Sequence, residues 1–401
     1  MQSGWRIGSL FKIPLYVDSS WFLILVLVTF LYGSDPDWQS TMGAVTAWGA
    51  GFLLALLLFA SVLLHELGHS LVARSQGIQV NSITLFLFGG IASIDKESKT
   101  PGQAFQVAIA GPLVSLSLFV LFSLLSGVLQ SAEITTAISY NMAQTNLVLA
   151  LFNLIPGLPL DGGQILKAAI WKATGSRNQG IRWAATVGKF LGWGAIGLGL
   201  LSYLNTQRFD LLWIALIGWF IVRNAQAYSR VNDLQEALAD LQAADAMMRD
   251  YRVVDANLTL RQFADDYLLQ EGRPPMYFAA SDGRYRGWVV VEDLRTVERS
   301  QWEQQTLMAI VRSLGEIPTV REATPLPQVI NQLEEQQLSR ITVLSPADAV
   351  AGVIDRGDIV RAIAAKMNIS ISDAVIQQIK EEGVYPPGLQ LQAIAQTATE
   401  S

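Results

Sequence analysis

Cysteine is absent from this chain of 401 residues, which excludes disulfide bonds and thiolate metal ligands. Histidine is almost absent, because only His65 and His69 occur. Charged residues make up only 15% of the chain, whereas 51% are hydrophobic. A catalytic metal site in this protein therefore has to be built from imidazole and carboxylate groups alone.

Charge divides the chain into two unlike parts. Residues 1–230 hold 13 Lys and Arg against 9 Asp and Glu, whereas residues 231–401 hold 15 against 25. The first part also contains the long apolar runs, and the second has the composition of an acidic soluble domain. We therefore expect an α-helical integral membrane domain at 1–230, a linker at 231–242 and an α/β module after it.

Six apolar stretches approach the roughly 20 residues that a spanning helix needs. They cover residues 15–32, 43–64 (continuing as helix to about 75), 104–130, 138–156, 183–204 and 209–227. Arg6 and Arg74 belong to the more basic loops, and Asp35 and Glu133 to the opposite ones. The positive-inside rule then predicts a multi-pass membrane protein with both termini in the cytoplasm.

The two histidines bracket a glutamate in the run His65-Glu66-Leu67-Gly68-His69, at the end of the second stretch. On a helix this spacing places both imidazoles on one face, while Glu66 is turned about 100° away and can reach a water held by a metal. The pattern is typical of zinc hydrolases. The alternative is a chance match in which both histidines only pack, but ionisable groups in an apolar span are costly and are usually functional.

A third ligand is predicted at Asp161, in the segment that follows the fourth stretch. That segment is broken by Pro156 and Pro159 and ends at the same membrane depth as the histidines. Asp161 would complete a tetrahedral zinc site with one exchangeable position, although it is also placed to cap the next helix. Asn153 is a candidate for positioning a substrate carbonyl, with an interhelical hydrogen bond as the alternative, and that alternative is favoured for Asn146.

Residues 78–95 combine β-branched and aromatic residues with a break at Gly89-Gly90, and predict a short membrane-associated hairpin beside the metal helix. Its exposed edge can bind an unwound substrate by β-addition. A hydrophobic re-entrant loop without that role is the competing interpretation.

Motifs at residues 65–69, 88–92, 110–112 and 153–163 occur in the order seen in the site-2 protease family of intramembrane zinc metalloproteases, which the first 230 residues resemble. The resemblance implies that His65, His69 and Asp161 bind one Zn²⁺ and that Glu66 activates the attacking water. It also implies that Asn153 helps to position the substrate. The implied reaction is hydrolysis of a peptide bond in or next to the transmembrane segment of a single-span membrane protein.

The second part of the chain contains a repeat of about 65 residues with the order strand, helix, strand, strand, helix. It is similar to a tandem pair of CBS domains, which we place at residues 243–300 and 301–367, with a tail at 368–401. Such modules often bind adenine nucleotides and regulate an attached enzyme or transporter, and a homodimer through them is expected. No nucleic-acid partner is indicated.

The resemblance places Asp293 and Asp358 at the positions that contact a nucleotide ribose. The hydroxyl residue usual three positions after the glycine is replaced by Val290 in one copy and Asp355 in the other. A structural or dimerising role is therefore as well supported as nucleotide binding. For the whole chain, the alternative to a protease is a CBS-regulated ion transporter that uses His65, His69 and Asp161 as a transient cation site.

Overall fold

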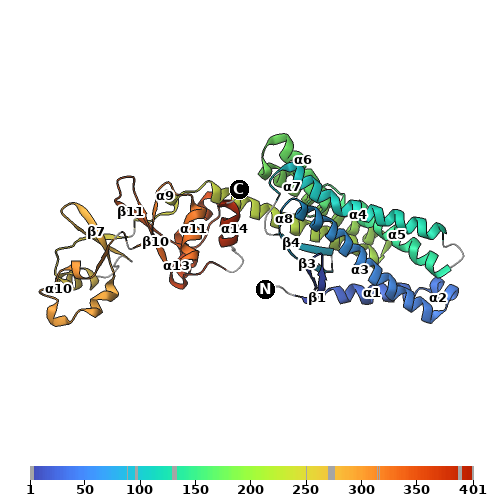
Figure 1. Cartoon of the computed structure of the whole chain (residues 1–401), viewed down its shortest axis with the longest axis horizontal. Coiled ribbons are helices and arrows are strands. Elements are labelled where there is room, and N and C mark those ends of the chain that lie inside the picture. The colour runs from blue at the N-terminus through green and yellow to red at the C-terminus, as the bar shows by residue number, and fades with distance from the viewer. Residues whose placement is uncertain are drawn as a thin grey trace. The chain divides into compact units, whose positions relative to one another are not determined.

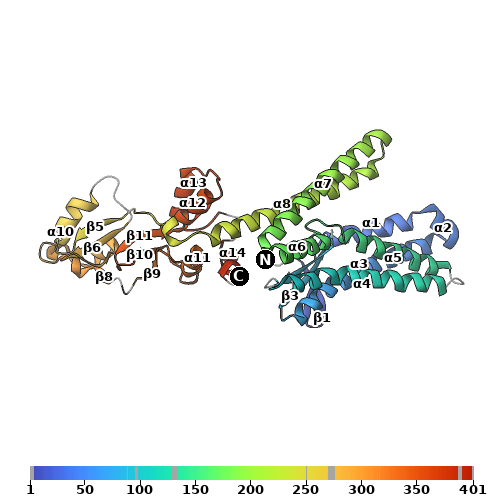
Figure 2. The same cartoon turned by 90° about the horizontal axis from the view of Figure 1, so that it is seen from above.

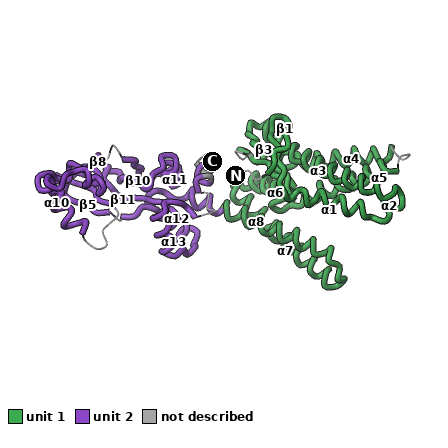
Figure 3. Tube along the Cα trace, turned by 90° about the horizontal axis from the view of Figure 1, so that it is seen from below, with its two compact units in different colours: residues 1–232 green, residues 233–401 purple. Residues whose placement is uncertain are grey.

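The computed structural model describes residues 4–87, 89–94, 98–128, 133–249, 251–269, 276–313, 315, 317–386 and 391–399. The chain divides into two compact units, residues 1–232 and 233–401 (Figure 3). The first is mostly helical and the second combines helices with two small sheets (Figure 1). The predicted fold class, a helical membrane domain followed by an α/β module, is confirmed.

Unit 1 consists of long helices and one mixed sheet. Its elements are β1 (Trp5–Leu10), β2 (Ile13–Val17), α1 (Trp21–Gly33), α2 (Pro36–Met42), α3 (Ala44–Ser75), β3 (Val80–Phe86), β4 (Gly89–Ile94), α4 (Pro101–Val128), α5 (Glu133–Asn153), α6 (Asp161–Thr174), α7 (Arg177–Thr206), the 3₁₀ turn η1 (Phe209–Leu211) and α8 (Leu212–Ala239). Helices α7 and α8 pack closely through Gly192 and Gly218 and diverge from α1, α3, α4 and α5 in Figure 2.

Among the described residues, four helices are long and apolar enough to cross a membrane, and they correspond to α3, α4, α7 and α8 extended back to Phe209. α5 contains the fourth expected stretch up to Asn153 but is not among these four. The first expected stretch, 15–32, is not one helix. Its start belongs to β2, and polar residues between Val17 and Trp21 separate that strand from the 13-residue helix α1. Thirteen residues rise only about 20 Å, against a hydrocarbon core of about 30 Å.

The predicted hairpin forms as β3 and β4, which pair antiparallel around the break at Gly89, while Phe88 lies outside the described residues. The strand order β1-β2-β3-β4 extends it, because β2 pairs in parallel with β3. Alternation in β2 buries Ile13 and Leu15 against Leu67 of the metal motif. The N-terminal residues therefore support the helix that carries the histidines, and β4 is left as a terminal strand.

Unit 2 contains the expected repeat. Its elements are α9 (Ala243–Ala246), β5 (Arg252–Asp255), α10 (Leu260–Phe263), the π turn η2 (Ala264–Leu268), β6 (Tyr277–Ser281), β7 (Arg284–Val289), the 3₁₀ turns η3 (Val291–Thr296), η4 (Arg299–Gln301) and η5 (Leu307–Ala309), β8 (Val311–Ser313), β9 (Thr319–Arg321), α11 (Leu326–Glu335), β10 (Arg340–Leu344), β11 (Val350–Asp355), α12 (Arg356–Lys366), α13 (Asp373–Glu382) and α14 (Leu391–Thr399).

In both copies the first strand is parallel to the second, and the second is antiparallel to the third. Two ranges expected to carry little structure differ from expectation. Most of the range 231–242 is the end of α8, and Leu238 and Leu241 belong to the core of unit 2. The range 368–401 contains α13 and α14, which bury Ile376 and Leu391 in the same core. Apolar residues at helical spacing explain this packing.

Candidate metal centre

Helix α3 places the imidazoles of His65 and His69 side by side, with ring centroids 5.0 Å apart. Helix α4 fixes the far side of each ring. His69 Nδ1 donates to the carbonyl oxygen of Val107 at 2.6 Å, and His65 Nδ1 lies 2.9 Å from the hydroxyl oxygen of Ser115. Since a carbonyl only accepts, His69 carries its proton on Nδ1, and the same tautomer of His65 satisfies Ser115. Both Nε2 lone pairs then point to one location.

Asp161 completes this location from the first turn of α6. Its Oδ2 lies 3.0 Å from His65 Nε2 and 3.3 Å from His69 Nε2, and the two Nε2 atoms are 3.3 Å apart. Ligands bound to zinc at about 2.1 Å in a tetrahedron stand about 3.4 Å from one another. Among the described residues, these three form the one group of histidine and acidic side chains spaced to hold a metal. Three converging lone pairs repel one another without a cation, so the donor set fits zinc.

A tightly packed loop presents Asp161. Leu158 is fully buried, its N–H donates to the carbonyl of Ala184 in α7, and Gly188 lets the α7 backbone approach closely. A Cβ at Gly188 would lie 2.1 Å from the Leu158 carbonyl oxygen. The irregular segment that two prolines predict is thus held against α7, which sets the position of the carboxylate.

Glu66 is on the same helix but belongs to a different part of the site. It is not a member of the three-ligand group, and its side chain faces β4, where a Cβ at Gly90 would lie 2.3 Å from Glu66 Cγ. Its carboxylate lines the same cavity as the three ligand residues. This is the arrangement that general-base action needs, since the group borders the metal location without being one of its ligands.

The two asparagines of α5 have different surroundings. Asn153, at the end of α5, places its Nδ2 3.4 Å from His65 Nε2, at the border of the metal location. Asn146 is fully buried and donates to the Ser61 hydroxyl of α3 and to the carbonyl of Met142. The interhelical hydrogen bond expected of Asn146 is confirmed.

The sequence pattern around Gly111 did not reveal the contribution of α4 to the site. A Cβ at Gly111 would lie 2.1 Å from His69 Nε2 and 2.6 Å from His65 Nε2, so only glycine leaves room for the ligand atoms. Ser115, which contacts His65, is one turn further along this helix. Small residues four apart on one helix face are the signal that could have located this contact.

A cavity of about 870 Å³ surrounds the site. It is lined by apolar and aromatic side chains and by a few polar groups, and Gly89, Gly90, Ile91 and Ala92 of β4 form part of its wall. The cavity is large enough for an extended peptide segment of several residues. The terminal strand β4 therefore borders the same cavity as Glu66 and the three ligand residues.

The two aspartates expected to contact a ribose are both paired within the chain. Asp293 makes three contacts of 2.9 to 3.2 Å with the guanidinium of Arg312 in β8. Asp358, only 4% exposed, lies 2.6 Å from the ammonium of Lys380 in α13. Neither pairing is visible in the sequence pattern.

Comparisons with known proteins agree on both units. The model of peptidase family M50 matches residues 53–145 and 130–194, and that of the CBS domain matches residues 311–365. The chain is 43% identical over 366 residues to a Synechocystis protein named "Putative zinc metalloprotease sll0528", covering 90% of this chain and 96% of that protein. It is 29% identical over 363 residues to zinc metalloprotease MJ0392 of Methanocaldococcus jannaschii, with coverages of 90% and 96%.

One solved structure, "Site-2 Protease from Methanocaldococcus jannaschii", is 31% identical and covers 57% of this chain and 95% of that one, with a TM-score of 0.41.

Proposed function

The chain belongs to peptidase family M50, the site-2 protease family of zinc metalloproteases, and we propose from this premise that it cleaves within the membrane. The proposed reaction is hydrolysis of a peptide bond in or next to the transmembrane segment of a membrane-anchored protein. The observation that carries the proposal is the convergence of His65, His69 and Asp161 within 3.0 to 3.3 Å, with Glu66 beside them, in a helical domain with four membrane-spanning candidates.

We assign the three converging residues as zinc ligands and Glu66 as the general base. Zinc bound there supplies a Lewis acid and a water acidic enough to lose a proton near neutral pH. Glu66 accepts that proton from the attacking water and delivers it to the leaving amine nitrogen. Asn153, at the border of the ligand cluster, donates its amide N–H to the developing oxyanion of the scissile carbonyl.

The substrate has to unwind before it can react, because a transmembrane helix keeps its carbonyls in hydrogen bonds. We propose that β4 receives the unwound segment. It is one of the two terminal strands of the sheet, and four of its residues line the cavity that contains Glu66. Main-chain hydrogen bonds to this edge would hold the peptide extended next to the metal.

The test of the mechanism is Glu66→Gln in purified full-length protein, with Glu133→Gln at the exposed start of α5 as the matched control. We expect the Glu66→Gln protein to keep one zinc per chain and to cleave a reporter transmembrane substrate at least about 100-fold more slowly. The Glu133→Gln protein should match the wild type. Wild-type cleavage by Glu66→Gln with zinc bound would refute the assignment and favour the transporter alternative.

The test of the docking edge uses the absence of cysteine from the chain. In the Glu66→Gln background, a single Ile91→Cys in β4 should form a disulfide with a cysteine near the cleavage site of the substrate. Val128→Cys, at the far end of α4 and 79% exposed, is the control. Equal cross-linking at both positions would exclude β4 as the docking strand.

We further propose that both termini are cytoplasmic, as the basic loops predict. A Ser9→Cys variant in β1 should then react with a membrane-impermeant maleimide only after the cytoplasmic face is opened. Labelling in intact cells would contradict this orientation.

A further inference from the structure

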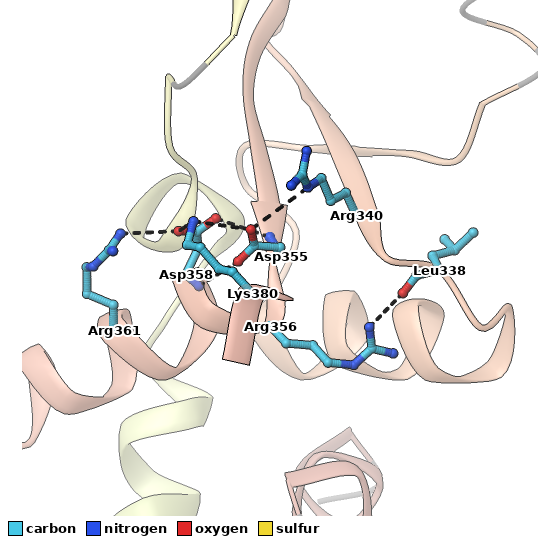
Figure 4. Close-up of polar contacts among 7 residues, drawn as sticks. All are labelled: Leu338, Arg340, Asp355, Arg356, Asp358, Arg361 and Lys380. Carbon is cyan, nitrogen blue, oxygen red and sulfur yellow. Dashed lines mark hydrogen bonds and ion pairs between the residues drawn. The ribbon is translucent and has the colours of Figure 1, made fainter. Parts of the chain in front are cut away.

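Helix α13 inserts Lys380 between the two acidic residues of the second CBS copy (Figure 4). The Lys380 Nζ atom lies 2.6 Å from Asp358 Oδ1 and 3.1 Å from Asp355 Oδ2. Both aspartates are buried, at 4% and 7% exposure, and the lysine side chain is only 18% exposed. The chain thus places its own ammonium group on a buried carboxylate pair.

All four carboxylate oxygens of this pair have a partner within the chain. Asp355 and Asp358 form a capping box at the start of α12, in which Asp355 Oδ1 accepts from the Asp358 N–H and Asp358 Oδ2 accepts from the Asp355 N–H. Lys380 takes the remaining oxygen of each residue, and Arg361 adds a contact of 3.2 Å to Asp358 Oδ1. A ribose hydroxyl would therefore have to share an oxygen that already has a partner, and the two oxygens that face Lys380 are covered by its ammonium group.

The backbone is shaped to receive the lysine. A Cβ at Gly357 would lie 2.6 Å from Lys380 Cγ and 3.1 Å from the Ile376 carbonyl oxygen, so a glycine here lets the lysine stem and α13 approach α12. Burial raises the pKa of Asp358, and the ammonium of Lys380 opposes that shift. The lysine therefore favours the ionised form of Asp358.

Further contacts hold the segment that contains α13. Ile376 and Ile379 are 2% and 4% exposed in the core of unit 2. Arg356, also buried, pairs with Glu334, donates to the Leu338 carbonyl and lies 5.8 Å from the ring of Tyr385, which follows α13. Apolar burial fixes where α13 lies, and the lysine connects it to the carboxylate pair.

We propose that α13 is an internal ligand of the second CBS copy, whose Lys380 occupies the carboxylate pair and closes it to adenine nucleotides. A neutral diol offers weaker partners to two carboxylates than a buried ammonium does, so a nucleotide cannot displace the lysine by its ribose alone. Exposure of the pair requires α13 to leave α12. The second copy would then signal by whether α13 is docked on α12 or released from it. This inference is independent of the proteolytic chemistry of unit 1.

The first experiment measures hydrogen exchange of the full-length protein with and without AMP and ATP at millimolar concentration. We expect no nucleotide-dependent protection of residues 352–360 in the wild type. Protection there that is lost in Asp358→Asn would overturn the proposal, because it would make the carboxylate a nucleotide contact. Protection that Asp358→Asn leaves unchanged would support it, because the nucleotide would then bind without this carboxylate.

The second experiment compares Lys380→Met with Lys366→Met, which removes an exposed lysine that pairs with Asp240. Loss of the buried ammonium should raise exchange in residues 373–382 by about 100-fold or more, since it removes the cation that the two buried carboxylates share and the contact that joins α13 to them. Strands β6 and β7 of the first copy should be unchanged. Equal exchange of residues 373–382 in both variants would overturn the proposal.

A third variant covers the case in which Lys380→Met unfolds unit 2. Lys380→Met/Asp358→Asn removes one charge of each sign and so avoids an excess of buried negative charge. It should still exchange faster in residues 373–382 than Lys366→Met does. Exchange equal to that of the control would show that the lysine does not hold α13.

Discussion

Two glycine-to-alanine substitutions should separate metal binding from proton transfer at the site. A methyl group added at Gly111 would lie 2.1 Å from His69 Nε2, whereas one added at Gly90 would lie 2.3 Å from Glu66 Cγ. Carbon and nitrogen atoms make contact at roughly 3.5 Å, so the neighbouring group has to move by about 1 Å in each case. The same chemical change therefore perturbs the ligands in one variant and the base in the other.

For Gly111→Ala the affected ring cannot move freely. His69 is held by its 2.6 Å hydrogen bond to Val107 and by the helix that carries it. Displacing it by about 1 Å removes one of three ligands from a geometry that tolerates only tenths of an ångström, so zinc affinity should fall on the order of 100-fold or more. The helix itself should not suffer, because alanine favours helix over glycine by about 1 kcal/mol.

For Gly90→Ala the atoms nearest to the added Cβ belong to Glu66 and Leu85, so the carboxylate of Glu66 is displaced instead of a ligand. We expect one zinc per chain and a cleavage rate about 100-fold lower, the size of a lost general base. The matched control is Gly102→Ala. Gly102 lies on α4, as Gly111 does, but a Cβ added there has nothing within 4 Å, so this variant should behave as the wild type.

Metal analysis by mass spectrometry, chelator competition and cleavage of a reporter transmembrane substrate measure both properties on each protein. Full zinc affinity in Gly111→Ala, or loss of zinc in Gly90→Ala, would refute the geometry on which the site is built. Loss of both properties in Gly102→Ala would show that α4 does not tolerate an added methyl group, and the Gly111→Ala result could then not be assigned to the ligands.

Three further outcomes are expected. Ser115→Ala removes the group that orients His65 and should weaken zinc binding about 10- to 100-fold. The control is Ser117→Ala, which should not weaken it, because the Ser117 hydroxyl donates to the Leu113 carbonyl of its own helix. Equal zinc affinities of the two variants would exclude an orienting role for Ser115. Treatment with a chelator should abolish cleavage, and stoichiometric Zn²⁺ should restore it; activity in metal-free protein would contradict a zinc mechanism. Phe263→Ala, at a fully buried position in the first CBS copy, should lower the free energy of unfolding of unit 2 by about 3 to 5 kcal/mol, measured by denaturant titration. A decrease below about 1 kcal/mol would mean that the core closes over the space left by the missing ring.

Local periodicity accounts for the parts of the site that could be predicted from the sequence. A four-residue spacing on a helix fixes His65 and His69 on one face whatever surrounds them, and the prolines before Asp161 mark where the chain leaves its helix. The break at Gly89 predicted the hairpin for a similarly local reason. That the two histidines and Asp161 meet at one location follows from their common membrane depth, which the loop charges and the lengths of the apolar stretches indicate.

Contacts made only by packing could not be predicted. Ser115 and Val107 are ordinary helix residues until α4 lies against α3, and Lys380 is 22 residues from Asp358 in a tail without recognisable chemistry. The end of strand β2 falls within the expected apolar stretch 15–32, because hydrophobicity averaged over 18 residues hides an alternation of buried and half-buried residues that is only five residues long. The polar residues between Val17 and Trp21 were the local signal of its end.

The parallel pairing of β2 with β3 makes residues 5–17 a structural component of the catalytic unit. Removing them, for instance by choosing a later start or by trimming an expression clone, would strip Ile13 and Leu15 from Leu67 and leave β3 with an unpaired row of amide and carbonyl groups. Such a shortened protein would expose β3 as a sheet edge, whereas β2 covers that edge in the intact sheet β1-β2-β3-β4. Self-association through that newly exposed β3 edge would then be expected, away from the β4 edge that we propose for the substrate.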